Sequence, residues 1–177
     1  PETLDHYIGQ QHLIGPQGAL RPQLDSGLIA SMILWGPPGT GKTTLAGLLA
    51  KETKREIFNL SAIDSGVAKV REVIQKAKDT SGLFAHSNPI LFIDEIHRFS
   101  KSQQDALLGA VEKGWVTLIG ATTEQPSFEV IPALLSRCQV YTLNALAPGS
   151  FHHRRRHTRH DGEDRHQQLR SDRRPIS

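Results

Sequence analysis

A lysine followed by two threonines ends a glycine-rich turn that lies between an apolar stretch and a helical pattern. The turn reads GPPGTGKT and fits the spacing G-x-x-x-x-G-K-[ST]. Its glycines allow successive backbone N–H groups to turn inward around phosphate oxygens, and the following helix start adds partial positive charge. We therefore expect a nucleoside triphosphate here, with Lys42 on the β- and γ-phosphates and the Thr43 hydroxyl on Mg²⁺. The candidate nucleotide-binding residues of the turn are Gly36, Pro37, Pro38, Gly39, Thr40, Gly41, Lys42, Thr43 and Thr44.

Two acidic residues end a second apolar stretch, ILFIDE, about 50 residues further along the chain. Asp94 is positioned to hold the water shell of Mg²⁺, and Glu95 to act as a general base or to polarise the water that attacks the γ-phosphate. A kinase needs no such water activator, so the pair favours hydrolysis. The alternative interpretation is a solvated strand end.

Two more polar features follow in LIGATTE and LLSRC. If the strand in LIGATTE neighbours the ILFID strand, a hydroxyl of Thr122 or Thr123 could contact the γ-phosphate or the attacking water. Arg137 could neutralise transition-state charge, from the same chain or from a neighbour. Taken alone, the threonines are an ordinary β-favourable pair and the arginine a surface residue. Cys138 is interpreted as a small buried residue without a partner for nucleophilic chemistry.

The order of apolar stretches predicts an α/β fold. Between Ser31 and Leu143, short apolar strands alternate with helical patterns, which is typical of a parallel sheet covered on both faces. Ligands of such sheets bind beyond the carboxyl ends of the strands. The expected strands are SMILW, EIFNL, PILFID, WVTLIGATT and QVYTL, and the expected helices are GKTTLAGLLAKET, GVAKVREVIQKAK, QQDALLGAVEKG with a glycine cap at Gly114, and a short PALLSRC.

Length and composition limit the class of protein. The 177 residues are 37% hydrophobic, which is enough for one compact domain. No run of about 18 apolar residues could span a membrane. The single cysteine excludes an internal disulfide and suits a reducing compartment. The chain begins with Pro1 rather than Met, and we expect it to be a fragment.

Basic charge is concentrated in the last thirty residues. Residues 148–177 hold 8 Arg and 4 acidic residues, whereas residues 1–147 hold 13 Lys and Arg against 14 acidic residues. The tail lacks the apolar surface needed to fold alone, so we expect it to be disordered. It could be a basic arm for nucleic acid or a His-rich metal tract. Our main interpretation is a frameshifted apolar segment, because His and Arg codons read one nucleotide later become codons such as Ile and Val.

Five stretches together carry a resemblance to a known family: PETLDHYIGQQHLIG, SMILWGPPGTGKTTLA, FIDEIHRFSKSQQDALL, LIGATTEQPSFEV and ALLSRC. They resemble the replication-associated recombination protein A family (RarA or MgsA, with the Werner-helicase-interacting protein as eukaryotic relative), in the clamp-loader-like branch of the AAA+ ATPases. The resemblance covers about residues 1–147 and implies a P-loop NTPase core, a three-layer α/β/α sandwich.

The resemblance also implies roles for individual residues. Ile8 and Gly9 would lie nearest the adenine, and Asp94 and Glu95 would be the metal-linked acid and the water activator. Thr123, more than Thr122, would be the first sensor. Arg137 would be a finger inserted into the ATP site of the next subunit, which implies a homo-oligomer.

Function follows from the same resemblance. It implies ATP hydrolysis with Mg²⁺ at stalled replication forks, with DNA and single-stranded DNA-binding protein as partners, in the cytoplasm at the nucleoid. Two rival interpretations remain: a clamp-loader subunit or Holliday-junction branch-migration motor, and a nucleotide-binding module without turnover. The second rival arises because the family's helical lid and tetramerisation region are not recognisable after residue 147. Gln125 also departs from the family, which usually has Asn there.

Overall fold

The structure is a computed structural model that describes residue 7 and residues 9–80 and 88–145. Ile8 and the basic tail, residues 148–177, lie outside the described residues. The expectations for the tail, and for a lid beyond residue 147, therefore stay predictions.

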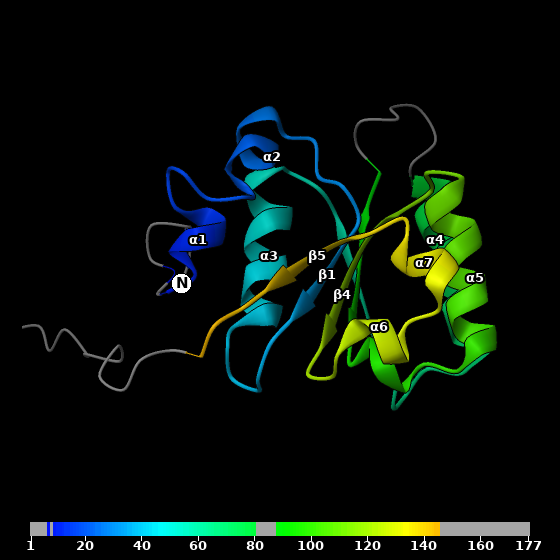
Figure 1. The fold of residues 1–177 in the computed structure, drawn as a ribbon. Coiled ribbons are helices and arrows are strands. Elements are labelled where there is room, and N and C mark those ends of the chain that lie inside the picture. The colour runs from blue at the N-terminus through cyan, green and yellow to red at the C-terminus, as the bar shows by residue number, and fades with distance from the viewer. Residues whose placement is uncertain (1–6, 8, 81–87, 146–177) are drawn as a thin grey trace, which may run out of the picture.

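Five parallel strands form one sheet, as the alternation of strands and helices predicts (Figure 1). Its order is β2-β3-β4-β1-β5, and every strand pair is parallel. The strands are β1 (Met32–Trp35), β2 (Ile57–Ser61), β3 (Ile90–Asp94), β4 (Thr117–Thr122) and β5 (Gln139–Thr142).

The described helices include all those expected and several short ones that the sequence patterns miss. The expected helices are α3 (Lys42–Glu52), α4 (Val67–Thr80), α5 (Lys101–Glu112) and α7 (Pro132–Leu135). The unexpected ones are α1 (Gln11–Ile14), α2 (Arg21–Ser26), the 3₁₀ turn η2 (Ile96–Arg98) and α6 (Pro126–Glu129). Segments of three to six residues complete fewer than two turns, so they carry no readable helical period.

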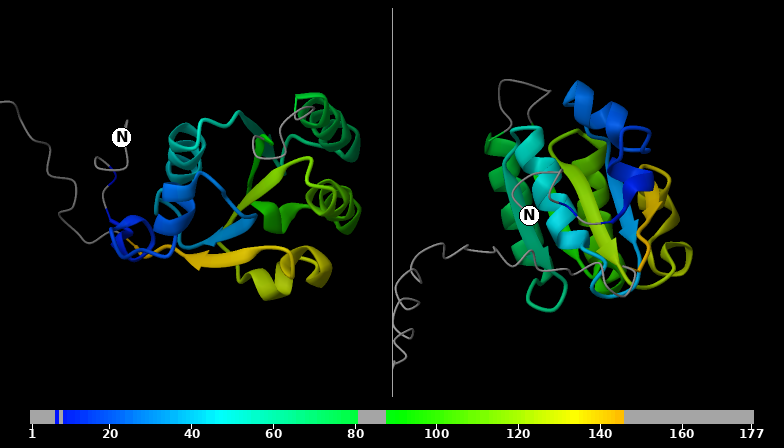
Figure 2. Two further views of the ribbon diagram at one scale, coloured as in Figure 1. Left: turned by 90° about the horizontal axis from the view of Figure 1, so that it is seen from above. Right: turned by 90° about the vertical axis from the view of Figure 1, so that its left-hand side faces the viewer.

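Helices cover both faces of the sheet, which confirms the predicted three-layer sandwich (Figure 2). Alternate residues of β1 face opposite ways: Met32 and Leu34 pack with Leu45 and Leu49 of α3 in one core cluster. Ile33 packs in the other cluster with residues of α4 and α5, such as Val70 and Leu107. Burial on both faces explains why these strands read as continuous apolar runs.

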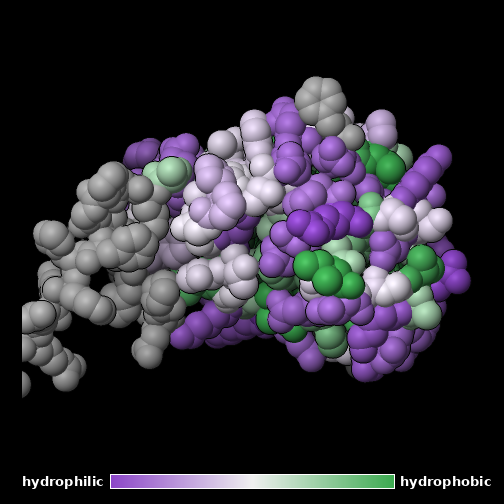
Figure 3. Space-filling view, turned by 90° about the horizontal axis from the view of Figure 1, so that it is seen from below, coloured by the Kyte–Doolittle hydropathy of each residue, from purple (hydrophilic) through white to green (hydrophobic). Residues whose placement is uncertain are grey.

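The parallel register brings three strand ends to one edge of the sheet. Trp35 at the end of β1 pairs with Thr122 at the end of β4, and Ile93 near the end of β3 pairs with Gly120. The P-loop, the acidic pair and the two threonines therefore meet at the carboxyl edge, the lower edge in Figure 1. Figure 3 views the molecule from this side, where most of the described surface is hydrophilic and the hydrophobic patches are small and separate.

Local hydrogen bonds fix both ends of α5. The Ser100 side chain accepts from the Gln103 backbone N–H, and the Gln103 side chain accepts from the Ser100 N–H, which is a capping box. At the other end, Gly114 adopts a left-handed φ of 69°. Its N–H bonds to Val111 and that of Trp115 to Ala110, a Schellman motif that confirms the predicted glycine cap.

Gln104 is a buried polar residue that joins α5 to the segment carrying α6 and α7. It is 3% exposed, and its Nε2 donates to the carbonyls of Phe99 (3.2 Å) and Glu129 (3.0 Å). Its Oε1 accepts from the Ile131 N–H at 2.8 Å. One side chain thus bonds three backbone groups from two separate segments of the chain.

We predict that Gln104→Ala lowers the free energy of unfolding by about 1–3 kcal/mol, because it leaves these buried groups unsatisfied. Urea denaturation measures the change. The control is Gln75→Ala, since Gln75 is exposed on α4 and bonds only Asp79, and its loss should change stability by less than about 0.5 kcal/mol. Equal effects of the two substitutions would show that Gln104 is not such a link.

Candidate nucleotide site

The glycine-rich turn is a rigid loop between the end of β1 and the start of α3. Gly39 and Gly41 adopt left-handed φ values of 76° and 87°. The Gly36 N–H donates to the Thr122 carbonyl at 3.2 Å, and a Cβ added at Gly36 would lie 2.6 Å from the Leu143 carbonyl oxygen. The first glycine is thus required by close packing, and the other two by backbone conformation.

Within the loop, the Lys42 ammonium donates to the carbonyls of Gly36 (2.8 Å) and Pro37 (2.9 Å) and to the Thr40 hydroxyl (3.3 Å). Thr40 is buried and donates in turn to the Pro37 carbonyl at 2.9 Å. Burial lowers the pKa of Lys42, and the Asp94 carboxylate partly opposes this shift. The ammonium is therefore held inside the loop, close enough to Asp94 to interact with it electrostatically.

The two acidic residues at the end of β3 have different surroundings. Asp94 is exposed, whereas Glu95 is half-buried with a left-handed φ of 53°. The Glu95 carboxylate forms an ion pair with the Arg98 Nε at 3.3 Å. A non-glycine residue in this conformation costs about 1–3 kcal/mol, and such outliers gather at functional sites. Glu95 shares this conformation with Gln10 and Lys54, so the backbone strain by itself assigns it no role.

The two threonines that end β4 differ in their hydrogen bonds. Thr122 is buried, and its hydroxyl bonds the His97 Nδ1 (3.0 Å) and both the N–H and the carbonyl of Glu124. Thr123 is half-buried, and its side chain bonds no other described residue. Because β4 neighbours β3, the condition for a sensor threonine is met, and Thr123 has the hydroxyl that remains available.

A metal ion that arrives with the nucleotide would find a suitable donor set here. Thr43 and Thr44 are exposed in the first turn of α3, and Asp94 is exposed beside Lys42. The described residues contain no group of three or more His, Cys, Asp or Glu that could hold a metal alone. Mg²⁺ usually takes one or two carboxylates together with phosphate oxygens and waters, so a hydroxyl and a carboxylate fit it.

Arg137 lies at the opposite edge of the sheet from the P-loop. It precedes β5, whose first residue pairs with Met32 at the start of β1. Its Nη2 forms an ion pair with the Glu112 carboxylate at 2.6 Å, and its Nη1 donates to the Ala133 carbonyl and the Ser136 hydroxyl. A strand of four residues spans about 13 Å, so the structure does not bring Arg137 to the chain's own phosphate-binding loop.

Comparison with known proteins identifies the family. Residues 32–145 match the family described as "ATPase family associated with various cellular activities (AAA)". The chain belongs to the AAA family.

Curated relatives match a longer part of the chain than the family model does. The AAA chain is 53% identical over 146 residues to replication-associated recombination protein A of Haemophilus influenzae and 52% identical over 147 residues to that of Escherichia coli K12. It is 49% identical over 146 residues to the ATPase WRNIP1 of Dictyostelium discoideum. These matches cover 82–83% of the chain but only 32%, 32% and 16% of the relatives. The resemblance inferred from the motifs is confirmed, and the chain spans about a third of the bacterial relatives.

Solved structures agree with the AAA assignment. The Thermotoga maritima RuvB Holliday junction branch migration motor superposes with a TM-score of 0.65 at 31% identity, over 82% of this chain and 48% of that one. No described helix of the AAA chain is long and apolar enough to cross a membrane.

Tyr7 and Gln10, which precede α1, contact the P-loop of the AAA chain; the family resemblance places residues 7–10 by the adenine but does not indicate these contacts. The Tyr7 hydroxyl is directed at the carbonyls of Gly41 (3.0 Å) and Thr40 (3.3 Å). Gln10 bonds Asn144 through both ends of its amide, at 2.7 and 2.9 Å. Ile8 lies outside the described residues, and Gly9 is half-buried with a left-handed φ of 85°. Tyr7 stands between His6 and Ile8, and a tyrosine in such a setting is too common to indicate a loop contact 33 residues away.

We predict that Tyr7→Phe destabilises the AAA chain by about 1 kcal/mol, because the Gly41 carbonyl, which also accepts from the Leu45 N–H, loses the Tyr7 hydroxyl as its second donor. In thermal unfolding this corresponds to a Tm lower by about 2–4 °C. Tyr141→Phe is the matched control: the Tyr141 hydroxyl bonds only the side chains of Gln23 and Gln139, so its loss should be nearly neutral.

The pH dependence of stability should also distinguish the two tyrosines. Burial raises the pKa of Tyr7 from 10.0 to about 12. Between these values the unfolded tyrosine ionises while the folded one stays neutral, so folding stability falls as pH rises from about 10 to about 12. Tyr7→Phe should remove that part of the fall, and Tyr141→Phe should not. A wild-type curve parallel to that of Tyr7→Phe would contradict the burial of this hydroxyl.

Proposed function

We propose that the chain binds ATP with Mg²⁺ at the carboxyl edge of the sheet and hydrolyses it to ADP and phosphate. One observation carries the proposal: the Lys42 ammonium is held inside the P-loop at the same edge of the sheet as Asp94, whose carboxylate opposes the fall that burial causes in the Lys42 pKa. A triphosphate needs positive charge and backbone N–H groups, which Lys42 and the start of α3 provide. Its metal ion needs a carboxylate, which Asp94 provides.

Each residue of the site has a physical task in this proposal. Lys42 exchanges its bonds to loop oxygens for bonds to the β- and γ-phosphates, at little cost because it is already inside the loop. Thr43 and Asp94 hold Mg²⁺, which would neutralise charge on the phosphate oxygens. Glu95 accepts a proton from the attacking water, or orients it, and Thr123 donates to the γ-phosphate. Glu95 must first loosen its contact with Arg98.

We further propose that Arg137 completes the site of a neighbouring copy. Its place at the amino edge supports this, because an arginine at that edge cannot contact a nucleotide bound at the other edge of its own sheet. Subunits packed with the amino edge of one against the carboxyl edge of the next make a heterologous contact, which closes into a ring when the rotation allows. The ion pair with Glu112 would hold the guanidinium ready for such docking.

The biological role follows from relatives and is proposed on that basis. Relatives about half identical in sequence are named for replication-associated recombination, so we propose a role in the maintenance of replication forks, recombination and repair. DNA and single-stranded DNA-binding protein are the proposed partners, in the cytoplasm at the nucleoid. The RuvB likeness keeps a branch-migration motor as the alternative, at lower sequence identity.

We predict that wild-type chain binds ATP and releases phosphate, whereas Glu95→Gln binds ATP equally well and releases phosphate at least about 100-fold more slowly. Nucleotide binding and phosphate release are measured separately on the same preparations. Glu56→Gln, at an exposed position just before β2, is a charge-matched control outside the nucleotide edge for the binding measurement. Binding without release above the Glu95→Gln level would instead support a module without turnover.

DNA structures and a sliding clamp, added to the same assay, separate the three candidate cellular roles. Stimulation of phosphate release by junctions of single- and double-stranded DNA supports fork maintenance. Stimulation confined to four-way junctions supports the branch-migration alternative, and stimulation by a sliding clamp supports a clamp-loader subunit.

We predict that Arg137→Ala and Glu95→Gln are each inactive alone and regain activity when mixed. In the mixture, a subunit with an intact Glu95 can lie next to one with an intact Arg137, so about a quarter of the sites in an equal random mixture are complete. Phosphate release is measured against mixing ratio, at protein concentrations where sedimentation shows oligomers. Failure of mixing to restore activity in such oligomers would rule out action of Arg137 on a neighbour.

A further inference from the structure

A cavity lies at the amino edge of the sheet, on the side opposite the nucleotide site. It has a volume of about 330 Å³ and is lined by Leu28, Ile29, Ala30, Arg55, Asn88 and Thr117. Three of these residues come from the segment between α2 and β1, and the others from the starts of β2, β3 and β4. Nothing in the proposed ATPase mechanism uses this cavity or its arginine.

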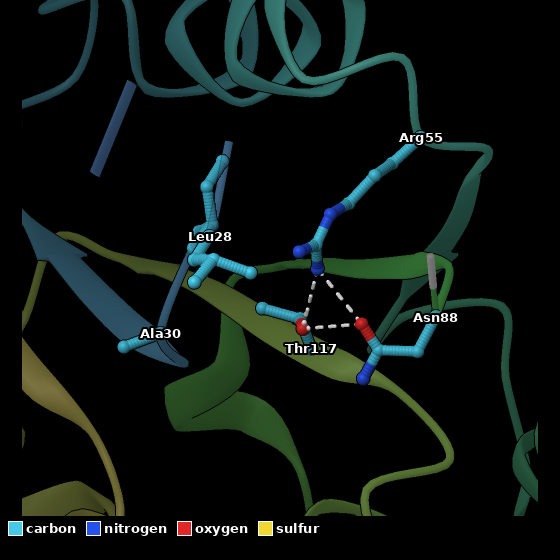
Figure 4. Close-up of a pocket in the computed structure, with 6 residues that line it drawn as sticks. Leu28, Ala30, Arg55, Asn88 and Thr117 are labelled. Atoms are coloured by element: carbon cyan, nitrogen blue, oxygen red, sulfur yellow. Dashed lines mark hydrogen bonds between the residues drawn. The ribbon is translucent and has the colours of Figure 1, made fainter. Parts of the chain in front are cut away.

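The guanidinium of Arg55 lies in this cavity, between Leu28 and the pair formed by Asn88 and Thr117 (Figure 4). Its Nη1 donates to the Asn88 Oδ1 at 2.8 Å and to the Thr117 Oγ1 at 3.2 Å, and its Nη2 donates to the Gly27 carbonyl at 3.2 Å. The Thr117 hydroxyl also donates to the Asn88 Oδ1, at 3.0 Å. The arginine is thus held in one orientation by neutral acceptors alone.

The positive charge of Arg55 has no acidic partner among the described residues. The ion pairs found there do not include it, although Glu52 and Glu56 are close in sequence. Its Nε is buried and has no hydrogen-bond partner. Burial lowers the pKa of Arg55, because a cation without an acidic partner is disfavoured when it is removed from water.

The unused donors define the ligand chemistry. A guanidinium has five N–H groups, of which two on Nη1 and one on Nη2 are used. The Nε–H and one Nη2 N–H remain, and two such donors match the two oxygens of a carboxylate. A phosphate would present further oxygens to a wall made of Leu28, Ile29 and Ala30, which offers them no side-chain donors.

We propose that this cavity binds a carboxylate on a short apolar stem, with the carboxylate on Arg55 and the stem against Leu28. Leu28 is 52% exposed, an unusual degree for a large hydrophobic side chain, so its apolar surface is available to the stem; a carboxylate contacts the buried Nε–H only after the side chains around it move. The carboxylate comes either from a free small acid or from an acidic side chain of a second copy. The inference is independent of the proposed ATPase function and stands if ATP binding fails.

Titration of the ¹⁵N-labelled chain tests the proposal, with the Arg Nε–Hε resonances as the readout. Butyrate is the probe, and butylammonium and inorganic phosphate at matched ionic strength are the comparison ligands. We expect butyrate to shift the Arg55 resonance saturably, with at least about tenfold tighter binding than phosphate and no saturable shift by butylammonium. Equal or tighter binding of phosphate, or no saturable butyrate shift, would overturn the proposal.

Variants identify the binding group. Arg55→Lys keeps the charge but lacks the planar fork, so butyrate binding should weaken by about tenfold or more. Arg71→Gln, at an exposed position on α4, should bind butyrate as the wild type does. Unchanged butyrate binding in Arg55→Lys would contradict the claim that the planar guanidinium of Arg55 recognises the carboxylate. If Arg55→Lys does not fold, the ligand series on the wild type still decides, because it requires no substitution.

A dilution series without added acid distinguishes the two sources. A shift of the Arg55 resonance that follows protein concentration and sedimentation supports an acidic side chain of a second copy. A resonance that is independent of protein concentration but responds to butyrate supports a free small acid. If the resonance responds to neither, the site is not a carboxylate site.

Discussion

The side-by-side pairing of β1, β4 and β3 is the constraint on which the rest of the site depends. Because the strands are parallel and in register, Trp35 ends beside Thr122, and Ile93 lies beside Gly120. The loop after β1 and the acidic residues after β3 are therefore presented at one edge, although more than 50 residues separate Lys42 from Asp94. The interaction of these two side chains is the direct consequence. A shift of one residue in the register of any of these three strands would turn its side chains to the opposite face of the sheet. Such a shift would disrupt both the hydrophobic core and the site.

Much of this arrangement could be predicted from sequence, because the signals are local. The strands are buried on both faces and read as apolar runs, and GPPGTGKT and ILFIDE place their chemistry directly after two of them. Ligands of such sheets bind beyond the carboxyl ends of the strands, and this rule predicts the edge at which the site lies. The cap at Gly114 was readable for the same reason, since a left-handed residue after a helix favours glycine.

The features that escaped prediction depend on contacts between distant residues. Tyr7 reaches the P-loop across 33 positions, and Gln104 reaches Ile131 across 27. In the sequence alone, neither a tyrosine nor a glutamine indicates such a distant partner. The pairing of Arg137 with Glu112 and the unpaired charge of Arg55 also appear only once the amino edge is assembled. The family resemblance predicts that Arg137 acts on the ATP site of a neighbouring copy, and our proposal rests on its position at the amino edge, away from the P-loop of its own chain.

ATP affinity of Lys42→Ala, measured with Mg²⁺ by displacement of a fluorescent nucleotide, tests the central claim most directly. Lys113→Ala is the matched control, because Lys113 is exposed at the end of α5, toward the opposite edge of the sheet from the loop. If Lys42 and the end of β3 hold one triphosphate, Lys42→Ala should weaken ATP binding by about tenfold or more, while Lys113→Ala leaves it unchanged. An affinity of Lys42→Ala equal to that of the wild type, in a folded protein, would contradict the account.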